Sequence, residues 1–323
     1  MYIVTGAAGF IGSCMVGKLN REGIYNIVIV DDFSREDRQN NWQTKKYALK
    51  IDRKEFLSWL KENATNMDID GIFHLGARTD TTESDWELFL RLNLNYTKEI
   101  WNICTQYDIP LVYASSAATY GAGEMGYEDD EQKIKDLHPL NLYGKSKQDF
   151  DLWQLAQNKR PTSWYGLKFF NVYGPNEYHK QRMASVILHS FEQIQANGEV
   201  GLFTSHKEGY KDGEQLRDFV YVKDLVEVMY FLMTNKPKSG IYNLGTGKAR
   251  TFYDLAKNVF TALGLGVNIK FVPMPEDIRD KYQYFTEAKI DKLRWAGYTK
   301  EFYTLEEGVK DYVNNYLEKH LYY

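Results

Sequence analysis

Short apolar runs alternate with longer helical patterns along the first half of the chain. The runs are rich in β-branched and aromatic residues, which is typical of strands buried on both faces of a sheet. Strands that alternate with helices predict a parallel sheet covered on both sides. The predicted strands are "YIVT" (2–5), "NIVIVDD" (26–32), "GIFHLGA" (71–77), "PLVYASS" (110–116) and "WYGLKFF" (164–170).

The second half of the chain has a less regular pattern. Strands are predicted at 218–222, 240–245 and 268–273, a polar loop at 207–218, and mostly helix in the last fifty residues. We therefore expect an α/β fold, a Rossmann-type doubly wound parallel sheet with a smaller C-terminal substrate domain. The sheet domain would comprise residues 1–170 with about 219–245, and the substrate domain 171–218 and 246–323.

A glycine motif, "TGAAGFIG", follows the first predicted strand and opens a helical stretch. Glycines at such a turn let backbone N–H groups approach a pyrophosphate at the helix N-terminus. Asp31 closes the second strand at the distance expected of the acidic residue in a dinucleotide-binding fingerprint. The motif therefore predicts an NAD(P) site at Gly6, Gly9, Phe10, Ile11 and Gly12.

The choice between NAD and NADP stays open from the residues around the second strand. Asp31 can accept a hydrogen bond from a ribose 2′-hydroxyl, and Asp32 adds charge that repels a 2′-phosphate. Arg35, Arg38 and Arg53 could instead neutralise that phosphate with forked donors, or form an ordinary solvated charged loop. Both nucleotides therefore remain candidates at this point.

The stretch "LNLYGKSKQDF" places Tyr143 one helical turn before Lys147, and Ser116 ends a central strand upstream. A tyrosine titrates near pH ~10, and a neighbouring ammonium, with the positive charge of a nicotinamide nearby, is expected to lower its pKa. Ser116 could hydrogen-bond the same substrate oxygen. The three residues predict a proton-transfer set beside a hydride acceptor. A second pair with the same spacing, Tyr253 and Lys257, has no such strand before it and is expected to be structural.

Composition and charge exclude several other classes of protein. Of the 323 residues, 43% are apolar and the net charge is −4, with no basic run, so we expect no nucleic-acid partner. No apolar stretch is long enough to span a membrane and no signal peptide is recognisable, which predicts a cytoplasmic protein without a membrane partner.

Cysteine and histidine usage adds little chemistry. Cys14 and Cys104 are far apart in the sequence, which fits neither a disulfide framework nor a metal site and favours a reducing compartment. The six histidines form no ligand pattern, so no metal is expected. His74 lies in an apolar strand, where we expect a hydrogen-bonded core residue.

The glycine turn, Asn93 in "NLNYT", Ser116, the Tyr143–Lys147 pair and "FFNVYGP" (169–175) occur in the order of the extended short-chain dehydrogenase/reductase superfamily. The chain resembles that superfamily over essentially its whole length. A narrower resemblance, carried by "FFNVYGPNEYHK", "RDFVYVKDL", "GIYNLGTGKARTF" and "KYQYFTEAKIDKLRWAGY", is to the ADP-L-glycero-D-manno-heptose 6-epimerases. It implies an ADP-heptose substrate for the lipopolysaccharide inner core, a bound NADP, and a cytosolic homo-oligomer, pentameric in the family.

The resemblance also implies roles for individual residues. Tyr143 and Lys180 become the two acid/base groups, Lys147 the cofactor-bound partner of Tyr143, and Arg217 a diphosphate clamp. Implied cofactor positions, besides the glycine turn, are Asp31, Asp32, Arg38, Arg53, Leu75, Gly76, Ala77, Arg78, Thr79, Asn93, Lys147, Val172 and Lys180. Implied substrate positions are Ser116, Asn171, Arg182, His189, Phe203, Arg217 and Tyr282.

Some positions depart from the family pattern. The family usually has Asp-Asn after the second strand, where this chain has Asp31 and Asp32, and lysines where Arg38 and Arg53 align. Gln181 and Arg182 follow Lys180 in a place where small residues are usual in the family. The loop before Arg217, the diphosphate clamp, is longer than is usual in the family. The charge around the predicted 2′-phosphate site is therefore kept positive by a different residue type.

The implied reaction is a transient oxidation at C6″, rotation of the resulting ketone about C5″–C6″, and re-reduction by the same cofactor. Nucleotide-sugar 4,6-dehydratases carry an Asp-Glu pair where this chain has Ala117 and Ala118, which disfavours dehydration. A UDP-hexose 4-epimerase shares the serine, tyrosine and lysine and remains an alternative, although the segment around Lys180 argues against it. A catalytically silent NAD(P)-binding regulator is less favoured, because it would be expected to lack Tyr143.

Overall fold

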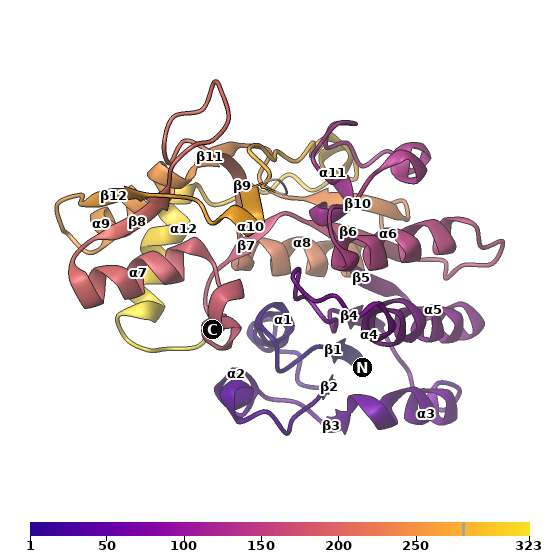
Figure 1. The fold of residues 1–323 in the computed structure, drawn as a ribbon. Helices are drawn as coiled ribbons and strands as arrows, with labels where there is room; N and C mark the ends of the chain where they lie inside the picture. Colours follow the sequence, from indigo (N-terminus) through magenta and orange to yellow (C-terminus); the bar gives the residue numbers. More distant parts are fainter. Residues whose placement is uncertain (280–281) are drawn as a thin grey trace.

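A seven-stranded parallel sheet forms the centre of the N-terminal half of the chain, seen in the computed structural model, which describes residues 1–279 and 282–323 (Figure 1). The strand order is β10-β6-β5-β4-β1-β2-β3. The chain moves outward in opposite directions from β1 and β4, so their carboxyl ends form a topological switch point where ligands bind. The predicted fold class is confirmed. The strands are β1 (Tyr2–Thr5), β2 (Ile27–Asp31), β3 (Leu49–Asp52), β4 (Gly71–His74), β5 (Leu111–Ser116), β6 (Trp164–Phe169) and β10 (Gly240–Leu244).

Helices cover both faces of this sheet (Figure 1). Successive strand side chains point to opposite faces, so Val4 and Ile29 join one core cluster while Ile3 and Val28 join the other. This explains why the strands are apolar throughout rather than alternating. One face carries α1 (Phe10–Arg21) and α8 (Val222–Asn235), and the other carries α3 (Arg53–Asn63), α5 (Tyr96–Tyr107) and α6 (Leu142–Leu155).

Two small sheets build the region drawn at the upper left of Figure 1. In the first, β9 pairs in parallel with β7 and antiparallel with β11, and in the second β12 pairs in parallel with β8. Helices α7, α9 and α12 pack together beside them. The bounds are β7 (Asn171–Tyr173), β8 (Val200–Phe203), β9 (Leu216–Tyr221), β11 (Ala249–Thr251), β12 (Ile269–Val272), α7 (Val186–Asn197), α9 (Phe252–Ala262) and α12 (Leu305–Tyr312).

The remaining helical segments are short. Most of them join strands to longer helices, and η5 joins β7 to α7 at the edge of the sheet. They are η1 (Glu36–Arg38), α2 (Gln39–Trp42), α4 (Trp86–Phe89), η2 (Leu90–Asn95), η3 (Ala117–Tyr120), η4 (Glu131–Asp136), η5 (Tyr178–Met183), α10 (Glu276–Arg279), α11 (Asp291–Trp295) and η6 (Val313–Leu317).

The structure contains every predicted strand, with ends that differ by up to three residues, and it adds β3, β7, β8 and β11. These additions have three or four residues each, too few for a clear periodic pattern. The predicted loop at 207–218 is wrong at its end, because residues 216–218 begin β9 and pair with β11. The last fifty residues hold short helices separated by irregular chain rather than continuous helix.

The predicted domain division falls partly on element boundaries. Residue 170 separates β6 in the large sheet from β7 in the small one. In the returning segment, β10 joins the large sheet and α8 packs on α1, whereas β9 lies in the small sheet. The division into a cofactor domain and a substrate domain itself stays a prediction.

His74 is buried and hydrogen-bonds Thr5 Oγ1 at 2.7 Å and Thr97 Oγ1 at 3.0 Å, which confirms the predicted core histidine. Cys14 and Cys104 are buried and form no disulfide. Over residues 1–279 and 282–323, none of the helices has the length and apolar character needed to cross a bilayer.

Candidate active site

The turn between β1 and α1 brings two backbone segments into direct contact. Gly6 has a φ of +70°, in the left-handed region, and a Cβ there would lie 2.6 Å from the backbone nitrogen of Gly76. A Cβ on Gly12 would collide with the carbonyl oxygen of Gly6. Only glycine therefore lets this turn close beneath α1.

The N-terminus of α1 is open to an anion. Its N-cap residue, Gly9, provides no side-chain cap, so the first N–H groups of the helix remain available to a ligand. The buried Asn41 fastens the turn from α2, because its Nδ2 donates to Ala8 O at 2.9 Å and to Asn176 O at 3.1 Å. Asn41 was not predicted, since it lies in a polar stretch with no distinctive pattern.

The carboxylate of Asp31 is already engaged by the backbone. Its Oδ2 accepts from Ala8 N at 2.8 Å and its Oδ1 from Asp32 N at 2.7 Å. Burial raises the pKa of Asp31, while these two N–H groups and then Arg38 act to lower it. Asp31 therefore supports the glycine turn directly, in addition to its predicted place beside the ribose.

Two arginines stand at the same strand end. Arg38 Nη1 lies 3.9 Å from Asp31 Oδ1, and Arg53 Nη2 lies 3.4 Å from Asp32 Oδ2. Among the described residues, the buried Arg38 Nε has no hydrogen-bond partner. Burial lowers the pKa of Arg38, with Asp31 opposing that effect. A partly exposed guanidinium with an unused donor suits a phosphate. Arg35 instead pairs with Asp37 on the surface.

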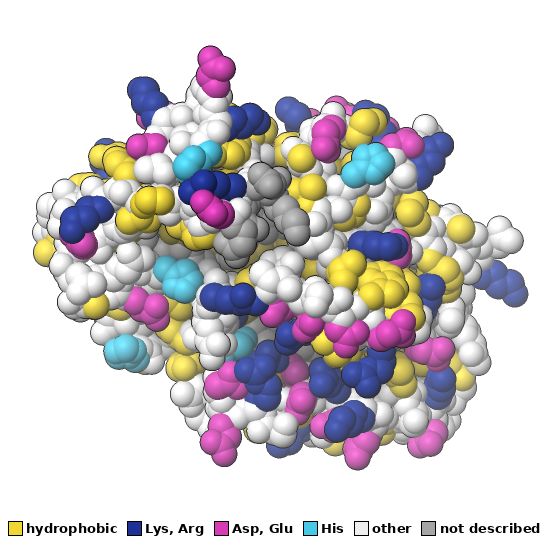
Figure 2. Space-filling model, in the orientation of Figure 1, with side chains coloured by type: hydrophobic (Ala, Val, Ile, Leu, Met, Phe, Trp, Pro, Cys, Tyr) yellow, Lys and Arg dark blue, Asp and Glu magenta, His cyan; other side chains and the backbone are white. Residues whose placement is uncertain are grey.

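Lys and Arg side chains mix with Asp and Glu over this end of the molecule, below the centre of Figure 2. Opposite charges are interspersed there rather than gathered into one basic surface. The positive charge that would face a nucleotide is therefore local to Arg38 and Arg53.

The loop after β4 lies against the glycine turn and holds the predicted cofactor positions 75–79. The backbone nitrogens of Leu75 and Gly76 both donate to Thr5 Oγ1 at 3.2 Å. Asn93 accepts from Arg78 N at 2.8 Å and donates to Arg78 O at 2.9 Å and to Ser146 Oγ at 3.0 Å. Asn93 therefore ties this loop to α6, beside Lys147.

Ser116, Tyr143 and Lys147 come together where β5 ends and α6 begins. The Asn141 side chain caps α6 by accepting from Gly144 N at 2.8 Å, which orients the first turn that carries Tyr143. Lys147 Nζ lies 6.0 Å from the centre of the Tyr143 ring. The predicted trio is thus brought to the carboxyl edge of the sheet.

Hydrogen bonds fix the other two members of this trio. Lys147 Nζ donates to the carbonyl of Ala114 at 2.8 Å. Ser116 Oγ accepts from Ala118 N at 3.1 Å, which leaves its own hydrogen to donate elsewhere.

Burial dominates the electrostatics of this trio. It raises the pKa of Tyr143, and a hydrogen bond with Ser116 acts in the opposite direction. It also lowers the pKa of Lys147 to about 8, while Asp151 acts to raise it. In the protein alone the tyrosine pKa is therefore raised rather than lowered, because loss of water around the phenolate outweighs the hydrogen bond with Ser116. The predicted lowering, which includes the charge of a nicotinamide, stays a prediction.

Lys180 lies on η5 beside the start of α1. Its Nζ is 5.4 Å from the centre of the Phe10 ring. Burial lowers the pKa of Lys180 and Glu177 acts to raise it. The next residue, Gln181, has a φ of 48° and a ψ of −130°, which kinks the segment. Lys180 therefore lies on the cofactor side of the edge, against the glycine turn.

Arg182, a predicted substrate contact, is bound to the loop after β4. Its Nη2 lies 3.1 Å from Asp80 Oδ1, and Arg78 Nη2 lies 3.3 Å from Asp80 Oδ2. Asp80 therefore joins a predicted cofactor residue to a predicted substrate residue. This carboxylate was missed by sequence reasoning, because nothing in the pattern of its loop distinguishes it.

Of the predicted substrate residues, Phe203, Arg217 and Tyr282 form a cluster. The buried Arg217 guanidinium lies 5.2 Å from the centre of the Tyr282 ring and donates to Leu216 O at 2.8 Å. The Phe203 and Tyr282 rings are 6.4 Å apart. The cluster combines cationic and aromatic groups that suit a nucleoside diphosphate.

Two further predicted substrate residues lie elsewhere. Asn171 is exposed on β7, and His189 on α7 lies 3.8 Å from Glu192. Within 1–279 and 282–323, no hydrogen bond or ring contact connects either to the Phe203, Arg217 and Tyr282 cluster. The rejected pair, Tyr253 and Lys257, lies on α9, where the tyrosine is exposed, in keeping with a structural role.

The chain belongs to the NAD dependent epimerase/dehydratase family, whose family model matches residues 2–245. A protein of Fusobacterium nucleatum named ADP-L-glycero-D-manno-heptose-6-epimerase is 54% identical over 99% of this chain and 98% of its own length. The crystal structure of the Helicobacter pylori protein of that name is 29% identical, with a TM-score of 0.81, over 97% of this chain and 95% of its own. The predicted superfamily is confirmed.

A structure of MoeE5 in complex with UDP-glucose and NAD is also similar to this chain. It is 26% identical with a TM-score of 0.75, over 99% of both chains. The family and this neighbour support a nicotinamide cofactor.

Proposed function

We propose that this protein interconverts ADP-D-glycero-D-manno-heptose and ADP-L-glycero-D-manno-heptose by epimerisation at C6″. The observation that carries the proposal is the near full-length identity of 54% with a protein of that name. The juxtaposition of Ser116, Tyr143 and Lys147 at the carboxyl edge of the sheet supports it independently.

The residues at the glycine turn fit a dinucleotide, and we favour NADP. The open N-terminus of α1 suits the pyrophosphate, and the unpartnered Arg38 Nε with the nearby Arg53 suits a 2′-phosphate. The Asp31 oxygens are already used by backbone N–H groups, which weakens the case for a ribose hydroxyl there. When bound, the nicotinamide would take hydride from C6″ and return it to the opposite face of the resulting 6″-ketone.

Tyr143 and Lys180 supply the proton transfers. Tyr143 stays protonated at neutral pH because burial raises its pKa, so its phenol can donate to the ketone oxygen. Burial lowers the pKa of Lys180, so its amine can accept a proton from the C6″ hydroxyl. Release of that proton to water and uptake of one by the Tyr143 phenolate restore both groups after each turnover. Two such groups suit an epimerisation, since the oxygen occupies a different place in each half-reaction. Ser116 orients this oxygen, and Lys147 holds the cofactor and Tyr143.

Arg217 holds the substrate diphosphate, and Phe203 and Tyr282 contact the nucleoside. Arg182, His189 and Asn171 complete the substrate site by family resemblance. We further infer a cytoplasmic homo-oligomer, a pentamer by resemblance, that serves the lipopolysaccharide inner core.

The purified protein incubated with ADP-D-glycero-D-manno-heptose should yield the L-glycero epimer, identified by NMR of the heptose. Unchanged substrate would overturn the proposal, and conversion of UDP-glucose at C4 would favour the 4-epimerase alternative. The cofactor is tested separately by the mass of the nucleotide released on denaturation. We expect the mass of NADP, and the mass of NAD would overturn that assignment alone.

A further inference from the structure

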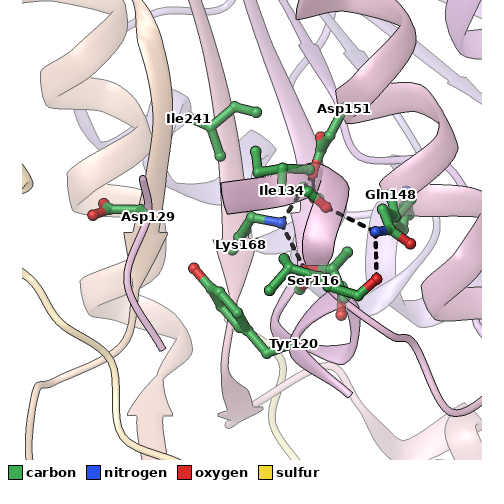
Figure 3. A network of polar contacts seen from close by, with 12 residues as sticks. Ser116, Tyr120, Asp129, Ile134, Gln148, Asp151, Lys168 and Ile241 are labelled. Atoms are coloured by element: carbon green, nitrogen blue, oxygen red, sulfur yellow. Dashed lines mark hydrogen bonds and ion pairs between the residues drawn. The ribbon is translucent and has the colours of Figure 1, made fainter. Parts of the chain in front are cut away.

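A fully buried ion pair lies behind the catalytic edge. Lys168 Nζ on β6 is 3.0 Å from Asp151 Oδ2 on α6, and both side chains are 0% exposed. Figure 3 shows the two side chains pointing toward each other near Ser116. Removing two charges from water is costly, and a neutral pair of similar volume would pack as well. Stability alone therefore does not account for this pair.

The pair is the centre of a satisfied network. Asp151 accepts hydrogen bonds from Ser115 Oγ at 2.7 Å and from Tyr113 OH at 3.1 Å. Lys168 donates to Thr119 Oγ1 at 2.6 Å, and its ammonium lies 5.1 Å from the centre of the Tyr120 ring (Figure 3). These contacts join β5, η3, α6 and β6, the four elements around the trio.

One chain of hydrogen bonds in the network connects Lys168 to Ser116. Thr119 Oγ1, which accepts from Lys168, donates to the carbonyl of Ser116 at 2.8 Å. This bond closes the turn η3 that begins directly after Ser116. Lys168 therefore holds the turn that aims the serine hydroxyl.

The other side of the network connects Asp151 to Lys147 through α6 and β5. Tyr143, Lys147 and Asp151 follow one another at intervals of four along α6, so they share one face of the helix. Lys147 bonds the carbonyl of Ala114 and Asp151 bonds the side chain of the next strand residue, Ser115. Adjacent residues of β5 thus anchor the lysine and the aspartate.

We propose that Asp151 and Lys168 are positioning residues, which fix Ser116 and Lys147 relative to each other and supply the negative charge that keeps Lys147 protonated. This inference rests on the proposed roles of Ser116, Tyr143 and Lys147.

The charges that face Lys147 come from several elements. Tyr143 and Asp151 lie on its own helix and His74 lies on β4. Asp151 in turn contacts Tyr113 on β5 and Lys168 on β6. Burial lowers the pKa of His74 to about 3, so this imidazole is neutral, and burial keeps Tyr143 a neutral phenol. Asp151 contributes the negative charge and raises the pKa of Lys147 against the larger effect of burial.

The sign of the pH effect follows from these charges. If the ammonium form of Lys147 is required, activity is lost as the pH rises through its pKa of about 8. Removing the Asp151 charge should move this alkaline limb to lower pH by about one to two pH units, the size expected for a charge one helical turn away at an effective dielectric of about 20 or more.

The test compares Asp151→Asn with the double variant Asp151→Asn/Lys168→Met, on the full chain with its nucleotide bound. Both should show a fall in kcat of roughly tenfold with little change in KM, and the single variant should show the shifted alkaline limb. The limb of the double variant should shift less, because it also loses the positive charge of Lys168. The double variant should melt above the single one, because Asp151→Asn alone leaves Lys168 buried without its counter-charge. The double variant also keeps the test valid if the single one does not fold.

Two controls separate positioning from general destabilisation. Lys168→Arg, which keeps the charge, should retain the wild-type limb. Asp224→Asn removes another buried carboxylate, one that accepts from Tyr303 N, and should lower the melting temperature without moving the limb.

Failure of the positioning role and failure of the proposed catalytic set would give different results. A wild-type alkaline limb in Asp151→Asn, or a wild-type kcat in the double variant, would overturn the positioning role of Asp151, even if the melting temperature fell. Full activity in Lys147→Met would overturn the proposed catalytic set itself.

Discussion

Two regions of the molecule each present a lysine to the same sheet edge, and Lys147 is buried whereas Lys180 is half-buried. On α6, Lys147 is held by a capped regular helix and donates to the carbonyl of Ala114. On η5, Lys180 precedes a kink at Gln181 and lies against the Phe10 ring. Burial lowers the pKa of both lysines.

The two lysines nevertheless differ in what opposes this burial. Asp151 supports the charge of Lys147 from one turn further along the helix. Glu177 supports that of Lys180, but its carboxylate also holds Gly174 N at 3.2 Å and Ser185 N at 2.7 Å. The comparison teaches that burial lowers the pKa of both lysines, to about 8 at Lys147, and that a different carboxylate opposes it on each segment.

Tyr143→Phe should produce the largest effect, because the phenol is proposed to contact the C6″ oxygen of the substrate, on which both lysines also act. We expect activity to fall by about 10³-fold, within the range for loss of a general acid. The variant should still release its nucleotide on denaturation, which serves as the control for folding and cofactor binding. Turnover at the wild-type rate would show that neither lysine works through this tyrosine.

Lys180→Met should reduce epimerisation by about 10²-fold while substrate binding, measured by calorimetry, stays close to wild type. Lys180→Arg sharpens the comparison, since arginine keeps a positive charge but does not give up its proton at neutral pH. A proton-transfer role predicts that arginine fails to restore activity. Restoration would mean that Lys180 acts only through its charge, as proposed for Lys147.

Arg38→Met should affect nucleotide binding and Lys180 on η5, but not Lys147 on α6. The loss of a charged contact to a 2′-phosphate should weaken NADP binding by roughly 10- to 100-fold and leave NAD binding nearly unchanged. Because Arg38 acts to lower the pKa of Lys180, the variant should also move that pKa upward. Fluorescence titrations with both nucleotides check the first effect, with Arg35→Met on the exposed pair as a matched control.

Lys257→Met should have the smallest effect. This lysine repeats the spacing of the catalytic pair on α9, which follows β11 of a small sheet rather than a strand of the large sheet. Activity and melting temperature should stay close to wild type, since substitutions at exposed helical positions change stability by about ±0.5 kcal/mol or less. A large loss of activity would show that Lys257 also takes part in the reaction. The strand before Tyr143 would then not be what distinguishes the catalytic pair.

The sheet and the glycine turn were predictable because their signals are local. Apolar runs of four to seven residues specify strands buried on both faces, and Gly6 and Gly12 are required where backbone meets backbone. The pairing of Tyr143 with Lys147 follows from helical spacing once the strand before it is recognised. Lys180 and the substrate positions were predicted only through family resemblance, since they lie on short or irregular segments.

By itself, the sequence determined the strand–helix alternation, the dinucleotide turn and the face of α6 that carries the tyrosine and lysine. Only the tertiary structure decided that burial raises the pKa of Tyr143, and that Lys168, read as part of an apolar strand, pairs with Asp151. The physical reason is that dihedral preferences and periodicity act between near neighbours in the chain. Burial and charge pairing depend on which distant segments pack around a residue.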